Sequence, residues 1–144
     1  MTIAKRNTIV VVMLISAFVA MLNQTILNTA LPAIISGLGI PETTAQWLIT
    51  GFMLVNGVMI PLTAFLMDRY STRGLYIFSM AAFLIGSLVA ALSPNFSILM
   101  VARVIQAIGA GILLPLMQFT VFTLFPVEKR GFAMGLTGIV AQSA

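Results

Sequence analysis

The sequence has 144 residues, of which 60% are hydrophobic and only 7% are charged, and its formal net charge at pH 7 is +4. A soluble domain carries roughly 25% charged residues, so this composition excludes an ordinary soluble fold and favours a membrane protein. The chain contains no cysteine and no histidine, which excludes disulfides, thiol catalysis, imidazole bases and thiolate or imidazole metal sites within it.

The first long apolar run follows two cations, Lys5 and Arg6. It is long enough to cross a bilayer, which takes about 20 apolar residues in helical form. We expect a helix over residues 9–31, ended by Pro32 and the glycines that follow it. A cleaved signal peptide is the alternative, but no clear cleavage site follows the apolar run, so we expect the helix to be retained.

Three further spans follow, separated by charges and turn residues. We expect helices over residues 45–67, 75–92 and 98–125, with turns at Asp68-Arg69 and Ser93-Pro94-Asn95. A fifth apolar segment, residues 131–144, is too short to span a membrane. The predicted fold class is therefore an all-α membrane protein with four transmembrane helices and the start of a fifth, forming one partial bundle over residues 1–144.

Positive charge is distributed unevenly among the loops. Six cations lie in the N-terminus and in the second and fourth loops: Lys5, Arg6, Arg69, Arg73, Lys129 and Arg130. The first and third loops carry none. By the positive-inside rule this places the N-terminus in the cytoplasm of a multi-pass membrane protein. Because these cations flank apolar runs, they indicate orientation and not a nucleic-acid-binding face.

A group of polar residues interrupts the first predicted helix: Asn23, Gln24, Thr25, Asn28 and Thr29. Amides are costly to bury in hydrocarbon unless they are hydrogen-bonded. Gln24 and Asn28 share a helix face at i,i+4, so we expect them to face other helices or a wet cavity. Hydrogen bonding between helices is the simpler alternative, but the crowding of polar residues favours a cavity wall.

Arg103 is the one charge expected inside a span. At the centre of a membrane a charged residue costs about 2.5–3.5 kcal/mol on insertion scales. Its long side chain could reach outward to the interface, or it could face the bundle interior, where Gln106 lies one turn further along the same face. We favour the interior position.

The turn between the second and third helices combines Asp68 with Arg69 and Arg73. The charge pattern alone is equally consistent with a solvated, positive-inside turn. The sequence contains no P-loop, metal-ligand cluster or nucleophile with a base. We therefore expect neither enzymatic activity nor a cofactor.

Four stretches nevertheless match one known family in order and spacing. They are residues 22–32 (LNQTILNTALP), 66–73 (LMDRYSTR), 103–111 (RVIQAIGAG) and 125–131 (FPVEKRG). The chain resembles the N-terminal third of the major facilitator superfamily, in its fourteen-helix drug:proton antiporter branch. Within that branch it is most similar to lincomycin-resistance and multidrug-export type proteins of Gram-positive bacteria.

The resemblance implies a drug-efflux carrier of the bacterial cell (inner) membrane, coupled to protons and working by alternating access. Its expected partners are the lipid bilayer, lipophilic drug-like molecules, protons and the missing C-terminal helices of the same protein, and not nucleic acid. Three groups of residues receive roles. Asp68, Arg69 and Arg73 form a conformational latch, Arg103 with Gln106 serves proton coupling, and Asn23, Gln24 and Asn28 border the central cavity.

Some positions depart from the family pattern. Asn23 stands where many relatives carry an acidic residue, so no predicted span contains a carboxylate, and Ser71 and Thr72 stand where the loop motif has Gly and Arg. Two alternatives remain open. One is a non-transporting membrane scaffold. The other is a small four-helix multidrug exporter, which the missing membrane carboxylate disfavours. The substrate, the coupling ion and a total of twelve or fourteen helices stay undetermined.

Overall fold

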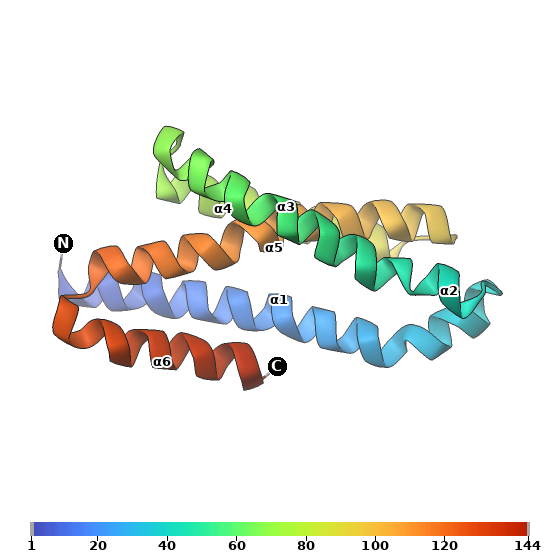
Figure 1. Ribbon diagram of the computed structural model, residues 1–144, viewed down its shortest axis with the longest axis horizontal. Helices are drawn as coiled ribbons and strands as arrows, with labels where there is room; N and C mark the ends of the chain where they lie inside the picture. Colours follow the sequence, from blue (N-terminus) through green and yellow to red (C-terminus); the bar gives the residue numbers. More distant parts are fainter. Residues whose placement is uncertain (1, 144) are drawn as a thin grey trace.

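The computed structural model describes residues 2–143, and those residues form a bundle of helices (Figure 1). The helices are α1 (Ile3–Leu38), α2 (Glu42–Ala45), α3 (Trp47–Arg69), α4 (Thr72–Ala91), α5 (Phe96–Leu124) and α6 (Val127–Ser143). Four segments are long and apolar enough to cross a membrane: Ile3–Leu38, Glu42–Arg69, Thr72–Ala91 and Phe96–Leu124. The predicted all-α membrane fold class is thereby confirmed.

The first helix is longer than the expected range of residues 9–31. Pro32 lies inside α1 and does not end it, contrary to our expectation. Transmembrane helices tolerate proline because neighbouring groups satisfy the carbonyl that it leaves free, and Pro61 and Pro115 likewise lie inside α3 and α5. The helix ends at Gly39, whose φ of 63° is left-handed and whose N–H bonds to the Ile35 carbonyl.

Side-chain caps explain where α4 and α5 begin. The Ser71 hydroxyl accepts a hydrogen bond of 3.2 Å from the Gly74 N–H, and the Asn95 side chain accepts one of 3.0 Å from the Ile98 N–H. Each satisfies a backbone donor that a helix start leaves without a partner. The caps place these starts a few residues before the expected positions 75 and 98. The final segment likewise begins early, at Val127 and not at residue 131.

Helix α5 forms the centre of the bundle and is the most buried of the four candidate spans. It packs against α3 and α4, while α6 runs back alongside α1 (Figure 1). Glycines allow the close approach of α4 and α5. A Cβ on Gly109 would lie 2.6 Å from the Ser79 carbonyl oxygen, and one on Gly86 would lie 2.9 Å from the Ala102 carbonyl oxygen. These distances exclude any larger residue without a shift of backbone.

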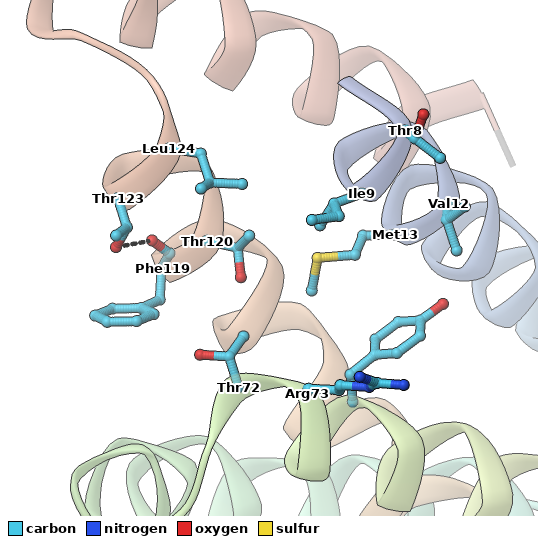
Figure 2. A pocket seen from close by; sticks show the side chains of 11 residues that line it. Thr8, Ile9, Val12, Met13, Thr72, Arg73, Phe119, Thr120, Thr123 and Leu124 are labelled. Carbon is cyan, nitrogen blue, oxygen red and sulfur yellow. Dashed lines mark hydrogen bonds between the residues drawn. The ribbon is translucent and has the colours of Figure 1, made fainter. Parts of the chain in front are cut away.

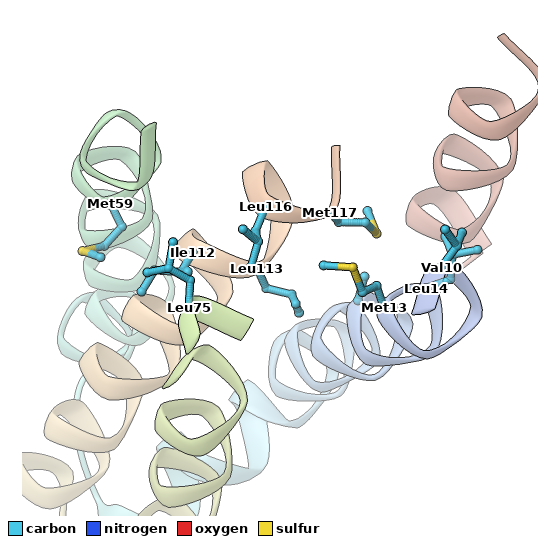
Figure 3. Packing of buried hydrophobic residues seen from close by; sticks show 10 residues of the cluster. Val10, Met13, Leu14, Met59, Leu75, Ile112, Leu113, Leu116 and Met117 are labelled. Atoms are coloured by element: carbon cyan, nitrogen blue, oxygen red, sulfur yellow. The ribbon is translucent and has the colours of Figure 1, made fainter. Parts of the chain in front are cut away.

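One end of α1 packs against the second half of α5. Met13 and Leu14 from α1 belong to the same buried cluster as Leu113, Leu116 and Met117 from α5 (Figure 3). The outward surface is also apolar, with Leu54, Ile85 and Leu88 among its exposed side chains. An apolar outward surface suits contact with lipid. The helices also satisfy their own backbone hydrogen bonds, as a lipid environment requires.

Candidate functional site

Arg103 lies in the interior of the bundle, only 1% exposed. Its Nε donates to the Leu48 carbonyl of α3 at 3.3 Å, and one terminal nitrogen donates to Gln106 Oε1 at 2.8 Å. The other terminal nitrogen donates to Gln24 Oε1 of α1. The side chain therefore does not reach outward to the interface, and the interior position that we favoured is the one observed.

An aromatic ring completes the surroundings of this guanidinium. Its carbon lies 4.2 Å from the centroid of the Phe52 ring, which belongs to α3. A cation over an aromatic face is stabilised by about 2 kcal/mol or more when the pair is desolvated. Arg103 is thus held by two amide oxygens, one carbonyl and one ring, all of them neutral.

Gln106 extends the network to a fourth helix. It is 2% exposed, and its Nε2 donates to Ser87 Oγ of α4 at 3.1 Å. Gly86 makes room for it, since a Cβ there would lie 2.7 Å from Gln106 Cγ. Together these contacts join α1, α3, α4 and α5, and we call Arg103, Gln24, Gln106, Ser87 and Phe52 the arginine network. Sequence reasoning missed Ser87 and Phe52, because a single serine or phenylalanine in an apolar helix carries no distinguishing signal.

The other polar residues of α1 lie elsewhere. Asn23 is half-buried and Asn28 is exposed, and neither takes part in the arginine network. The shared face that we expected for Gln24 and Asn28 therefore does not bring both into one site. Of the three cavity residues predicted on α1, the structure joins Gln24 alone to Arg103.

The predicted latch residues are exposed at the ends of α3 and α4. The Arg69 guanidinium lies over the Phe65 ring at 4.8 Å, and Asp68 precedes it in the last turn of α3. Arg73 instead borders a cavity of about 550 Å³ between α1, α4 and α5 (Figure 2). This cavity is also lined by Thr8, Ile9, Val12, Met13, Thr72, Tyr76, Phe119, Thr120, Thr123 and Leu124.

A second, smaller cavity of about 140 Å³ adjoins the arginine network, with which it shares Gln24 and Phe52. Asn56 of α3 also lines it, and its Oδ1 is buried without a hydrogen-bond partner. The sequence gives no signal for Asn56 as part of a site, because one asparagine in an apolar helix forms no pattern. Within residues 2–143 no group of three side chains could hold a metal ion.

Comparison with known proteins gives one consistent family. A family model described as Major Facilitator Superfamily matches residues 13–143. The uncharacterized MFS-type transporter YcnB of Bacillus subtilis is 52% identical over 139 residues, covering 96% of this chain and 29% of that protein. The lincomycin resistance protein LmrB of the same organism is 42% identical, covering 94% of this chain and 28% of that protein.

A more distant relative comes from another bacterium. The probable multidrug resistance protein EmrY of Escherichia coli is 38% identical over 122 residues, covering 85% of this chain and 24% of that protein. The chain thus spans less than a third of the length of these relatives. No solved structure gives a significant match.

Proposed function

The chain belongs to the major facilitator superfamily, and on that premise we propose that it is the N-terminal part of a drug-efflux carrier. The observation that carries this proposal is the arginine network, in which the buried cation Arg103 of α5 bonds to α1 and α3, and its partner Gln106 bonds to α4. Buried charges in membrane spans mark substrate and ion pathways. Relatives named for lincomycin and multidrug resistance support drugs as the substrates.

We further propose that the N-terminus faces the cytoplasm of a bacterial cell membrane. In Figure 1 the N-terminus, the α3–α4 turn and the α5–α6 connection all lie toward one end of the bundle. The six cations of the N-terminus and of these two connections therefore gather at that end. The positive-inside rule supports the cytoplasmic assignment.

Proton-driven antiport by alternating access is the mechanism that we propose. In carriers of this kind two bundles rock around a site near the middle of the membrane, and no covalent step is needed. Glu42, Asp68 and Glu128 all lie near helix ends, exposed to the surroundings. The protonated carboxylate is therefore expected on other helices of the full-length protein, since the relatives are more than three times as long as this chain.

Efflux by the full-length protein tests the proposal. Expression in a bacterium deficient in efflux should lower the accumulation of lincomycin and raise its minimal inhibitory concentration several times. A protonophore should abolish the difference, because it collapses the gradient that drives the antiport. Unchanged accumulation across a panel of lipophilic antibiotics would contradict drug efflux. Efflux that persists with the protonophore would contradict proton coupling but would leave drug efflux standing.

The latch gives a more specific prediction. Asp68→Asn should slow efflux by the full-length protein while leaving the amount of inserted protein unchanged, because the carboxylate acts in the conformational switch and is exposed in the folded bundle. Glu42→Gln, which removes another exposed carboxylate at the start of α2, is the matched control and should transport normally. Efflux rates divided by protein level on immunoblots provide the measurement. A loss of Asp68→Asn protein from the membrane would instead indicate a structural role.

A further inference from the structure

Pro115 leaves one carbonyl of α5 without its helical donor. In an α-helix the carbonyl of each residue accepts from the N–H four residues further on, and proline has no N–H. Pro115 lies inside α5, so the carbonyl that lacks this donor is that of Gly111. Gly111 is buried, and buried carbonyls are nearly always hydrogen-bonded. A side chain on a neighbouring helix is the expected source of a replacement donor.

Thr63 of α3 provides that donor. Its Oγ1 donates to the Gly111 carbonyl oxygen at 3.1 Å, and the threonine is fully buried. The close approach of α3 depends on the missing side chain of Gly111, since a Cβ there would lie 2.5 Å from Met59 Cβ. The glycine therefore admits α3, and the proline four residues later frees the carbonyl to which α3 then bonds.

The Thr63 hydroxyl has a second acceptor within its own helix. Its Oγ1 also lies 2.7 Å from the Met59 carbonyl oxygen, one turn earlier in α3. A hydroxyl has one hydrogen to donate, so the two carbonyls share it. Threonines in helices often bond in this way to the carbonyl four residues earlier, and Thr120 of α5 does so with Leu116 at 2.7 Å. The bond to Gly111 differs from these, because it joins two helices at a proline.

The bond to Gly111 lies between two parts of α5 that have different contacts. Arg103 and Gln106 precede it and bond to α1, α3 and α4. Leu116 and Met117 follow Pro115 and pack in one cluster with the first half of α1. Sharp bends in helices occur mostly at proline, where a backbone hydrogen bond is missing. A donor held beside Pro115 therefore restrains the angle between the two parts.

We propose that Thr63 is a positioning residue, whose hydroxyl replaces the hydrogen bond that Pro115 removes and so holds the part of α5 that carries Arg103 against α3. It acts through the backbone of α5 and not by contact with a substrate or an ion. The transport readout of this inference rests on the proposed efflux function, whereas its stability readout does not depend on transport.

A double-mutant cycle in the full-length protein tests the hydrogen bond. Thr63→Val keeps the branched shape and removes the donor, so it should lower the melting temperature in detergent by about 2 °C. Pro115→Ala restores an N–H that can bond to the Gly111 carbonyl. In that background Thr63→Val should therefore lower the melting temperature much less. Thr120→Val is the matched control, since it removes only a bond within one helix, and its effect should be small and equal in both backgrounds.

Equal drops for Thr63→Val in the two backgrounds would overturn the hydrogen-bond assignment. If Pro115→Ala does not fold, Thr63→Val is compared with Thr120→Val instead. A larger drop for Thr63→Val would then support the assignment, and equal drops would overturn it.

Efflux at matched protein level tests the positioning role. Thr63→Val should reduce efflux several times, whereas Thr63→Ser keeps the hydroxyl and should stay near the wild type. Unchanged efflux in Thr63→Val, or an equal loss in Thr63→Ser, would overturn that role. A wild-type protein without efflux would contradict the proposed function instead, and the melting temperatures would still test the bond between Thr63 and Gly111.

Discussion

Arg103→Ala is expected to abolish drug efflux by the full-length protein while leaving the amount of inserted protein near that of the wild type. Two effects on stability oppose each other. Removing a central charge relieves an insertion cost of about 2.5–3.5 kcal/mol. The same change leaves the acceptors on Gln24, Leu48 and Gln106 without their donor, at about 1–3 kcal/mol for each buried group that stays unsatisfied.

The Leu48 carbonyl keeps its place in the backbone hydrogen bonding of α3, and the two glutamine side chains can turn to other partners, so we expect about one group to stay unsatisfied. The two effects on stability then nearly cancel, and the main loss should be in function. Without the guanidinium, α1 loses its polar connection to α5, and Gln106 loses the contact that orients it toward Ser87. Efflux should then fall to the level of cells without the carrier, as measured by drug accumulation at matched protein level. Arg103→Lys should also be severely impaired, since an ammonium lacks the fork that reaches three acceptors at once.

A surface cation provides the comparison for these variants. Lys129 is exposed in the first turn of α6, and Lys129→Ala should transport normally. Efflux by Arg103→Ala equal to that of Lys129→Ala would remove Arg103 from the transport mechanism. Loss of the Arg103→Ala protein from the membrane would show that the free-energy cost of the unsatisfied acceptors exceeds the insertion cost that removing the charge relieves. The arginine network would then have a structural role.

The sequence was sufficient to predict those parts of the fold and site that depend on local spacing. Apolar runs between charges predicted the four spans, because length and hydropathy are properties of the chain alone. Arg103 and Gln106 are three residues apart on one helix, so their contact followed from helical geometry. The effect of Pro32 could not be predicted in this way, since whether a proline ends a membrane helix depends on its neighbours.

The partners on other helices depend on how those helices cross, which no local pattern records. A backbone carbonyl such as that of Leu48 has no sequence signature at all. Gln24 and Asn28 differ in burial although they share a face, because α1 leaves the arginine network beyond Gln24. Further along, Leu31 of α1 packs against Ala45 and Leu48 instead. Periodicity gives the direction in which a side chain points, whereas the helix crossing determines what it meets.

Gly109→Leu is expected to prevent α4 and α5 from packing closely and so to lower the stability of the bundle. A Cβ at Gly109 would lie 2.6 Å from the Ser79 carbonyl oxygen and 2.9 Å from the Phe83 nitrogen, and both are backbone atoms. Backbone cannot yield as a flexible side chain does, so the helices must separate. Overpacking of a core typically costs about 1–3 kcal/mol and occasionally more, and we expect the upper end here.

The same separation should reach the arginine network, because Gly86 and Ser87 lie on the face of α4 that meets α5. The measurement is the fraction of full-length protein that elutes as a single species from size exclusion in detergent, together with its melting temperature. Gly57→Leu is the matched control, since a Cβ at that exposed position of α3 meets no atom within 4 Å. Gly57→Leu should resemble the wild type. Equal melting temperatures for the two variants would show that the distance between α4 and α5 is not set by Gly109, and the link from helix packing to the position of Gln106 would then fail.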